Sequence, residues 1–416
     1  MTRTEPLAQI RPTPRRKVLI SGASVAGPAL AFWLNRYGYS VTVVEKAATL
    51  RSGGYPIDIR GTALEVVRRM GILPQLRDAH VDLRRLTFLD RDGGKVASVS
   101  PHAVAGSVAG RDLEVRRGDL TDALYTAVRD DVEFLFNDSI DALDQSDPSD
   151  TSGPSGRGVD VTFRGGSSRT FDMVFGADGL HSRTREILFG PEEQFHRYLG
   201  YCFAGFTMRN TFGLSHEIMM WNTPGRAAAL YAVGDDNDEV HAFLNFAHPE
   251  PSFGAFRAPD SQRGLVASVF ADAGWEVPGM IAAMRDADDL FVDVVSQIRM
   301  PHWSSGRVAL VGDAAYAPSF LTGQGSSLAL VGAYMLAGAV AARDATAGFA
   351  AYERSTREFV TMNQDQIGEG DATLFPTTAR ALEQRNEMLR DLSTMPSAEG
   401  RPAHSALTLP EFTPMR

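Results

Sequence analysis

The sequence predicts an α/β fold in which a domain built on a parallel sheet is interleaved with a domain built on a mostly antiparallel sheet, followed by C-terminal helices. Residues 16–45 have the pattern of a strand, a glycine turn, a helix and a second strand. Residues 198–246 contain several short alternating segments, which are typical of antiparallel strands. A buried-strand pattern returns at residues 307–315, so the antiparallel sheet is predicted to be an insertion.

The first element is a glycine turn that follows the apolar run Val18–Ile20. In this turn, GASVAG, Gly22 permits the sharp bend and Gly27 lets the following helix pack close to the strand. The amides at the start of that helix would face a pyrophosphate. Ser24 stands where the G-x-G-x-x-G fingerprint has its second glycine, and a side chain is tolerable there because it is small.

A helix and a second strand complete this unit. The helix ends near Gly38, and the strand at residues 40–44 delivers Glu45. Glu45 stands 23 residues after Gly22, close to the spacing of about 20 at which a carboxylate accepts the hydroxyl groups of an adenosine ribose. The turn alone is weak support, but the ordered set predicts a Rossmann-like domain that binds a dinucleotide.

Two further glycine turns follow apolar strands, at residues 176–185 (GADGLHSRTR) and 311–325 (VGDAAYAPSFLTGQG). In an open α/β sheet, ligands gather at the carboxyl ends of the strands. The three turns are therefore predicted to meet at one site.

The remaining pattern predicts a hairpin at residues 86–100 and strands at 132–136 and 159–163. Helices are predicted at residues 263–273, 279–284, 326–342, 349–360 and 377–392. The predicted organisation is a flexible tail at 1–15, a nucleotide-binding domain at 16–80, 101–185 and 295–345, a substrate-binding domain at 81–100 and 186–294, and C-terminal helices and tail at 346–416.

Composition bounds the function. A chain of 416 residues suggests about two to three domains. The net charge of -10 argues against broad binding to nucleic acid or anionic membranes. The single cysteine, Cys202, excludes an internal disulfide and a cysteine-rich metal site. No apolar run is long enough for a signal peptide or a membrane span, so we expect a cytoplasmic protein.

The three ordered motifs resemble those of the class A flavoprotein monooxygenases, the FAD-dependent aromatic hydroxylases, and especially their tetracycline-modifying and polyketide-tailoring members. The resemblance covers roughly residues 16–360. It implies that the first turn and Glu45 hold the ADP half of FAD, and that D-G-x-x-S-x-x-R, matched at Asp178, Gly179, Ser182 and Arg185, lies near FAD and the nicotinamide nucleotide.

The third motif is implied to hold the flavin itself. Asp313 would accept a hydrogen bond from the ribityl chain, and Pro318 would lie beside the ring. The helix that opens at Gly323–Gly325 would direct its positive end at the N1–C2=O edge, which becomes negative on reduction. The residues implied for the cofactor are Gly22, Ser24, Gly27, Glu45, Arg51, Asp58, Arg117, Asp178, Gly179, Arg185, Gly312, Asp313, Pro318, Gly323, Gln324 and Gly325.

The chain departs from the family pattern at three positions. Many relatives have histidine where Tyr316 stands, asparagine at Ser327 and aspartate at Gly332. These departures bear on the detailed flavin contacts.

The substrate cavity is expected between the nucleotide-binding domain and the inserted sheet. Its candidate wall residues are Phe203, Phe206, Met219, Trp221, Tyr231, Phe243 and Phe320. Phe203 and Phe206 differ in parity, so a regular strand turns only one of them toward the cavity. His181, His216, His241 and His302 are isolated in the sequence, and no general base is assigned.

The resemblance implies an FAD-dependent monooxygenase that uses NADPH or NADH and O2 to hydroxylate a phenolic or polycyclic aromatic compound through a C4a-hydroperoxyflavin. A Baeyer–Villiger outcome from the same intermediate and a non-catalytic flavoprotein that binds a polycyclic ligand stay open. A halogenase is disfavoured because its W-x-W-x-I-P motif is missing. No motif for a metal site, a nucleotide triphosphatase or a serine hydrolase occurs.

Overall fold

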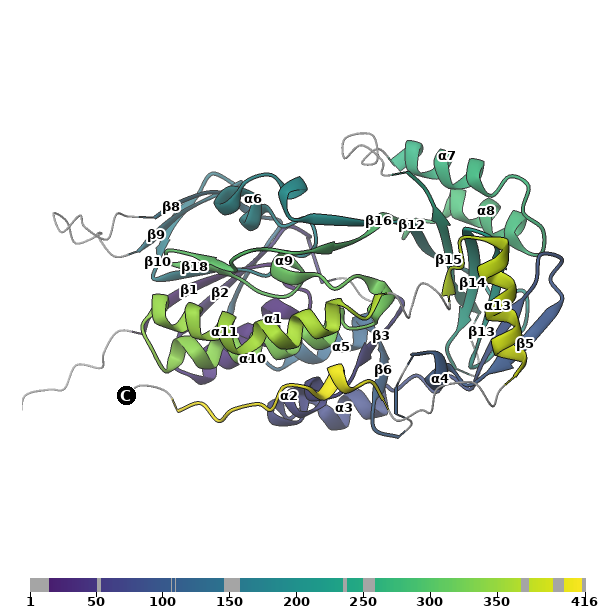
Figure 1. The fold of residues 1–416 in the computed structure, drawn as a ribbon. Coiled ribbons are helices and arrows are strands. Elements are labelled where there is room, and N and C mark those ends of the chain that lie inside the picture. The colour runs from purple at the N-terminus through teal and green to yellow at the C-terminus, as the bar shows by residue number, and fades with distance from the viewer. Residues whose placement is uncertain are drawn as a thin grey trace, which may run out of the picture.

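Two lobes lie side by side in the computed structural model, and the long strands β12 (His196–Arg209) and β16 (Phe291–Ile298) run between them (Figure 1). The structure describes residues 15–50, 54–105, 107–108, 110–145, 158–234, 238–249, 259–367, 374–391 and 400–413. Within these residues, no helix is both long and apolar enough to cross a bilayer.

The first lobe contains a six-stranded sheet in the order β17-β18-β11-β1-β2-β7, in which only the β17–β18 pair is antiparallel. The predicted strand, turn, helix and strand at the start of the chain are confirmed as β1, α1 and β2. The strands are β1 (Lys17–Ser21), β2 (Ser40–Glu45), β7 (Glu133–Phe136), β11 (Met173–Gly176), β17 (Ser304–Ser305) and β18 (Val308–Leu310).

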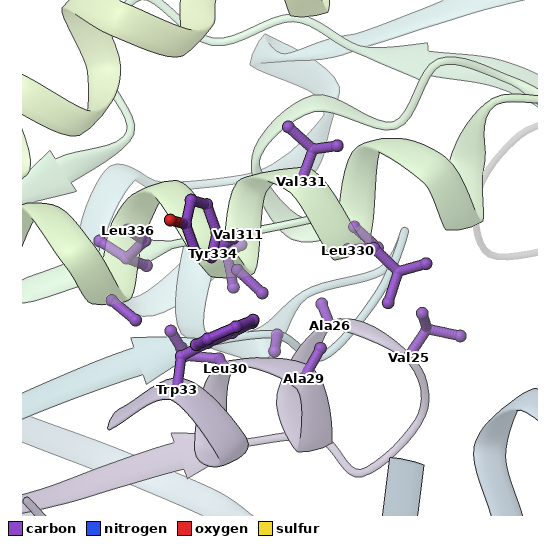
Figure 2. Packing of buried hydrophobic residues seen from close by; sticks show 14 of the residues in the cluster. Val25, Ala26, Ala29, Leu30, Trp33, Val311, Leu330, Val331, Tyr334 and Leu336 are labelled. Carbon is purple, nitrogen blue, oxygen red and sulfur yellow. The ribbon is translucent and has the colours of Figure 1, made fainter. Parts of the chain in front are cut away.

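Helices α1 (Ala26–Arg36) and α10 (Gly325–Ala341) pack together against this sheet. Trp33 on α1 lies edge-on to Tyr334 on α10, with ring centroids 4.8 Å apart (Figure 2). Nearly all of α10 is buried, and its alanine and glycine residues let neighbouring helices approach closely. The other helices of this lobe are α2 (Thr62–Met70), α3 (Leu73–Asp78), α5 (Arg117–Thr126), α6 (Arg183–Phe189), α9 (Asp313–Tyr316) and α11 (Ala345–Gln364).

The second lobe is a seven-stranded sheet in the order β16-β12-β15-β14-β13-β4-β5. Only the β13–β4 pair is parallel, so the predicted mostly antiparallel sheet is mixed in this one detail. Helices α7 (Pro259–Val269) and α8 (Val277–Asp286) cover one face, and α13 (Ala379–Arg390) lies near β5. The remaining strands are β4 (Arg85–Leu89), β5 (Lys95–Val99), β13 (Glu217–Thr223), β14 (Arg226–Ala232) and β15 (Glu239–Ala247).

Two small sheets were not predicted. One has the order β10-β9-β8 and covers the first lobe, and the other pairs β3 with β6 between the lobes. Their strands are β3 (Pro56–Ile59), β6 (Leu113–Arg116), β8 (Ile140–Gln145), β9 (Val159–Phe163) and β10 (Ser168–Phe171), and a short helix, α4, spans Pro101–Ala105.

Residues 400–413 run back along α2 and α10 (Figure 1). The Pro410 carbonyl accepts hydrogen bonds from Arg69 at 3.2 Å and from the Tyr334 hydroxyl at 2.6 Å. The Phe412 ring lies where Gly338 leaves room, since a Cβ at Gly338 would approach it to 1.9 Å. This segment is therefore part of the packing of the first lobe.

Candidate functional site

One cavity of about 1060 Å³ is lined by both lobes. Its lining includes the ends of β1, β2 and β11, the start of α10 and one face of the seven-stranded sheet. The three glycine turns of the sequence therefore meet at one site, and an aromatic wall faces them.

The first turn is built around two close backbone approaches. Gly22 has φ 106°, and its amide donates to the Val44 carbonyl at 2.8 Å. A Cβ at Gly22 would lie 2.4 Å from the Ala177 carbonyl oxygen, and a Cβ at Gly27 would lie 1.9 Å from the Gly22 carbonyl oxygen. Side chains are therefore excluded at both glycines by sterics. Gly22 lines the cavity, and Gly27 shapes the turn from behind.

Ser24, the departure from the fingerprint, has a partner in this structure. Arg117, at the start of α5, donates from Nη2 to the Ser24 Oγ at 2.9 Å, and both residues line the cavity. No side chain caps the N-terminus of α1, and its first turn carries no acidic residue. An anion at this turn would meet uncapped amides and a guanidinium.

Glu45 is held at the end of β2 by two backbone amides. Its Oε2 accepts from the amide of Ala23 at 2.8 Å, and its Oε1 accepts from the amide of Ala47 at 2.9 Å. The carboxylate is thus fixed beside the turn on the cavity wall, and each oxygen retains a lone pair for another donor.

The second motif folds back on itself. Asp178 accepts hydrogen bonds from the Ser182 hydroxyl and, at 2.9 Å, from the amide of Thr184, which fixes the start of α6. Gly179 has φ 84° and lines the cavity with Asp178.

Arg185 departs from its predicted placement, because it is fully buried and does not line the cavity. Its guanidinium donates to the carbonyls of Ala314 and Leu180 and to Glu192, at 3.1, 2.7 and 2.5 Å. Burial lowers its pKa. Arg185 therefore joins the second motif to the third from behind the cavity. Arg183 of the second motif and Arg117 at the start of α5 line the cavity.

The third motif presents a carboxylate to the cavity. The Asp313 side chain opens into the cavity. Desolvation by the surrounding protein raises the pKa of Asp313 above its ordinary value, although the charge of Arg117 acts in the opposite direction. Gly312 has φ 65° and does not line the cavity, since it packs toward Ala26.

The segment after Asp313 leads to the start of α10. Pro318, Gly323 and Gly325 line the cavity, whereas Gln324 is buried and does not. The N-terminus of α10 has neither a side-chain cap nor an acidic residue in its first turn. Its amides and positive dipole end are therefore open to a ligand.

Asp58 lines the cavity from β3 and pairs with Arg60 at 2.6 Å. A Cβ at Gly323 would come within 2.8 Å of its carboxylate, so Asp58 lies close to the start of α10. Arg51, also predicted to contact the cofactor, lies outside the described residues.

Four of the seven predicted wall residues line the cavity: Phe203, Tyr231, Phe243 and Phe320. The other three, Phe206, Met219 and Trp221, lie on the opposite face of the sheet, in the core beneath α7 and α8. Alternation along a strand explains the division, and the predicted opposition of Phe203 and Phe206 is confirmed.

Several further aromatic and apolar residues of this wall were not predicted from the sequence. Tyr55 lies 6.4 Å from Phe203 and 6.0 Å from Phe243 between ring centroids, and Phe375 lies 6.2 Å from Phe320. Further wall residues are Ile218, Met220 and Phe291. Strand alternation could have indicated two of them, because Ile218 and Met220 alternate with Met219 and Trp221 and therefore lie on the other face of the strand.

Tyr231 joins the second lobe to the small β3–β6 sheet. Its hydroxyl donates to Glu114, which lies on β6 opposite Asp58 in the β3–β6 register. Burial, and next the charge of Asp58, raise the pKa of Glu114 to about 8. Burial also raises the pKa of Tyr231.

His181, isolated in the sequence, lies between two carboxylates. Its Nε2 is 3.2 Å from Asp293 on β16, and its Nδ1 is 2.8 Å from Glu192, which also binds Arg185. Hydrogen bonds to Asp293 and to Glu192 raise the pKa of His181 to about 9. The imidazolium therefore joins the second motif to a strand of the seven-stranded sheet.

This arrangement predicts a pH dependence of stability. Because the folded-state pKa is raised above the ordinary value of about 6.5, the contribution of His181 is complete below that pH and is lost as the pH rises through about 9. Urea unfolding between pH 6 and 10 should show a smaller loss of stability with rising pH in His181→Gln than in the parent protein. His302→Gln, at an exposed histidine, is the control. Identical slopes for parent and His181→Gln would contradict the assignment.

Two of the departures from the family pattern, Tyr316 and Gly332, are linked because they share the same space. A Cβ at Gly332 would lie 1.8 Å from the Tyr316 hydroxyl, which receives a hydrogen bond from Tyr352 at 2.9 Å. Tyrosine at 316 therefore requires glycine at 332, whereas a shorter histidine leaves space for a side chain there.

We predict that Gly332→Ala destabilises the protein by about 1–3 kcal/mol through overpacking. Adding Tyr316→Phe, which removes the hydroxyl, should recover part of this loss, so the two substitutions should be non-additive in a double-mutant cycle of unfolding free energies. Additive costs would show that the two sites do not share this space.

No protein-family model matches the chain. The chain is 43% identical over 352 residues to an uncharacterized protein of Mycobacterium tuberculosis, Rv1260, covering 84% of this chain and 92% of the relative. It is 35% identical over 405 residues to a flavin-dependent monooxygenase from an unknown prokaryotic organism, covering 95% of this chain and 99% of the relative.

Among solved structures, the chain is similar to the tetracycline destructase Tet(55), with a TM-score of 0.80, 34% identity, and coverage of 96% of this chain and 99% of the other. The chain therefore belongs to the flavin-dependent monooxygenases. The class A FAD-dependent family implied by the sequence motifs is confirmed.

Proposed function

We propose that the cavity binds FAD across the three turns. The ADP half would lie on the first turn, with the ribose at Glu45 and the pyrophosphate near Ser24 and Arg117. The ribityl chain would lie at Asp313 and the flavin ring beside Pro318. One observation supports this proposal above the others. The N-termini of α1 and α10, which no side chain caps, lie at the same cavity as the Asp313 carboxylate and the Arg117 guanidinium. This donor and acceptor set fits an extended dinucleotide.

The site would then use FAD to oxygenate a phenolic or polycyclic aromatic compound. Bound FAD supplies the redox chemistry, taking reducing equivalents from NADPH or NADH and activating O2. The start of α10 would stabilise the negative charge that develops at the N1–C2=O edge of the ring. Phe203, Phe243 and Phe320 would orient the substrate and keep water out.

The substrate class rests on this aromatic wall and on the name of a similar structure. Four rings of the wall lie within stacking or edge-to-face distance of Phe203, namely those of Tyr55, Phe243, Phe291 and Phe320. Such walls suit fused planar rings. Tet(55) is a tetracycline destructase, which supports a polyketide-like or tetracycline-like substrate.

The function is tested by screening aromatic and polyketide compounds, including tetracycline, with the FAD-loaded enzyme. We expect one class to stimulate NAD(P)H consumption and to yield a product that gains one oxygen atom by mass spectrometry. The position of that oxygen separates ring hydroxylation from insertion beside a ketone. Tight ligand binding without NAD(P)H consumption or product would overturn the enzymatic proposal in favour of a binding protein.

Phe320 and Phe206 provide a matched test of the wall. Phe320 lines the cavity and is 41% exposed, whereas Phe206 is buried on the core face. Phe320→Ala should weaken substrate binding with little loss of stability. Phe206→Ala should cost about 3–5 kcal/mol of stability and leave the substrate affinity of the folded protein unchanged. Isothermal ligand titration and urea unfolding measure the two effects, and the reverse pattern would exclude this wall.

A further inference from the structure

Two buried polar side chains on the cavity wall have a polar atom without a partner. The amide oxygen of Asn245 on β15 and the hydroxyl of Ser296 on β16 make no hydrogen bond, although the two residues are only 5% and 4% exposed. Other buried side-chain atoms without a partner occur among the described residues, but only Asn245 and Ser296 carry such an atom and also line the cavity. A buried polar group without a partner costs free energy, so each needs a physical reason.

Strand alternation directs Asn245 into the cavity. Phe243 and Asn245 line the cavity, whereas Leu244 and Phe246 are packed in the core under α7 and α8. The cross-strand neighbours of Asn245 are Phe203 on β12 and Ala227 on β14. The amide is therefore surrounded on its own face by apolar side chains, and none of these neighbours offers a side-chain donor.

Ser296 lies on β16, opposite Tyr198 of β12. It precedes Gln297, whose side-chain amide donates to the carbonyls of Pro318 at 3.1 Å and Gln364 at 2.8 Å. Ser296 is thus close to the segment where the proposed flavin ring would lie. Asn245 lies within the sheet of the second lobe, between Phe203 and Ala227, on the side of the cavity left for the substrate.

We infer that Asn245 is a specificity residue that accepts a hydrogen bond from a hydroxyl group of the substrate. The inference rests on the proposed function and sharpens it: the substrate is an aromatic or polycyclic compound that carries a phenolic or enolic hydroxyl beside an apolar ring face. The rings would contact Phe203 and Phe243, and the hydroxyl would supply the donor that the amide oxygen lacks. A few polar groups in an otherwise apolar pocket are what fix a ligand's orientation.

The test compares two probes of similar size, 1-naphthol and 1-methoxynaphthalene, of which only the first donates a hydrogen bond. Binding to the FAD-loaded protein is followed by the change in flavin absorbance without NAD(P)H, so no turnover is required. We expect the parent protein to prefer 1-naphthol by roughly three- to tenfold. Asn245→Leu should bind both probes equally.

Thermal stability separates this role from a structural one. Asn245→Leu removes an amide oxygen that has no hydrogen-bond partner, so its melting temperature should equal or exceed that of the parent. The control is Asn222→Leu on β13, because the Asn222 amide is paired with the Leu374 carbonyl at 3.0 Å and with Arg385 at 3.1 Å. That substitution should lower the melting temperature.

The inference is overturned if the parent does not prefer 1-naphthol, or if Asn245→Leu keeps the preference. A structural amide would behave differently: Asn245→Leu would then lower the melting temperature, as Asn222→Leu does, and would keep the preference for 1-naphthol. That result would also overturn the inference. These outcomes leave the proposed function intact. If neither probe binds, the aromatic cavity of the proposed function fails and the role of Asn245 fails with it.

Discussion

Replacing Asp313 by alanine is expected to weaken FAD binding by roughly 10- to 100-fold, because a hydrogen bond to a charged group contributes about 1.5–3 kcal/mol. Among the described residues, no ion pair or side-chain hydrogen bond involves its carboxylate, which opens into the cavity. The loss should therefore fall on the cofactor and not on the fold. Titration of the apoprotein with FAD, followed by quenching of flavin fluorescence, measures it.

The control for Asp313→Ala is Asp344→Ala. Asp344 caps α11 by accepting a hydrogen bond from the amide of Ala347 at 3.0 Å, and it does not line the cavity. This control should lower stability by about 1 kcal/mol without changing the affinity for FAD. Equal FAD affinity in Asp313→Ala and the parent would remove Asp313 from the cofactor site.

Gly27→Ala is expected to have the second large effect. The added Cβ would lie 1.9 Å from the Gly22 carbonyl oxygen, so the turn and the start of α1 must separate. Overpacking of this kind costs about 3 kcal/mol, and the displaced amides should no longer hold a pyrophosphate. We expect lower stability in urea and protein that purifies without FAD.

Gly264→Ala is the matched control, since Gly264 also lies within a helix, α7, but a Cβ there meets nothing within 4 Å. Alanine is the better helix former by about 1 kcal/mol, so this substitution should stabilise the protein. The same chemical change should thus have opposite signs at the two positions. A stable, FAD-containing Gly27→Ala protein would contradict the geometry of the turn.

The sequence was sufficient where the determinants are close together along the chain. The unit β1, α1 and β2 could be predicted because its strands, glycines and acid lie within 30 residues. The small sheets were missed because their pairing is not local: β3 and β6 are separated by more than 50 residues, and Asp58 meets Glu114 only through that pairing.

The site was predicted in part for two physical reasons. Alternation along a strand predicts which residues share a face, but it does not predict which face lines the cavity. Phe203 and Phe243, which line the cavity, were therefore grouped with Trp221, which faces the core. A motif specifies a residue type but not its hydrogen-bond partners. The Arg185 guanidinium was predicted to contact the cofactor, but it donates hydrogen bonds to Glu192 and to two backbone carbonyls. The unpaired amide oxygen of Asn245 could not be predicted from the sequence, because a missing partner is a property of the fold.

The segment at residues 400–413 bears on how the protein is made. It packs on α2 and α10, and the start of α10 opens into the cavity. Synthesis on the ribosome proceeds from the N-terminus, and domains generally fold as units. Here the lobe that begins at β1 cannot complete its packing until residues 400–413 have emerged, so we expect cofactor loading to follow the translation of this segment.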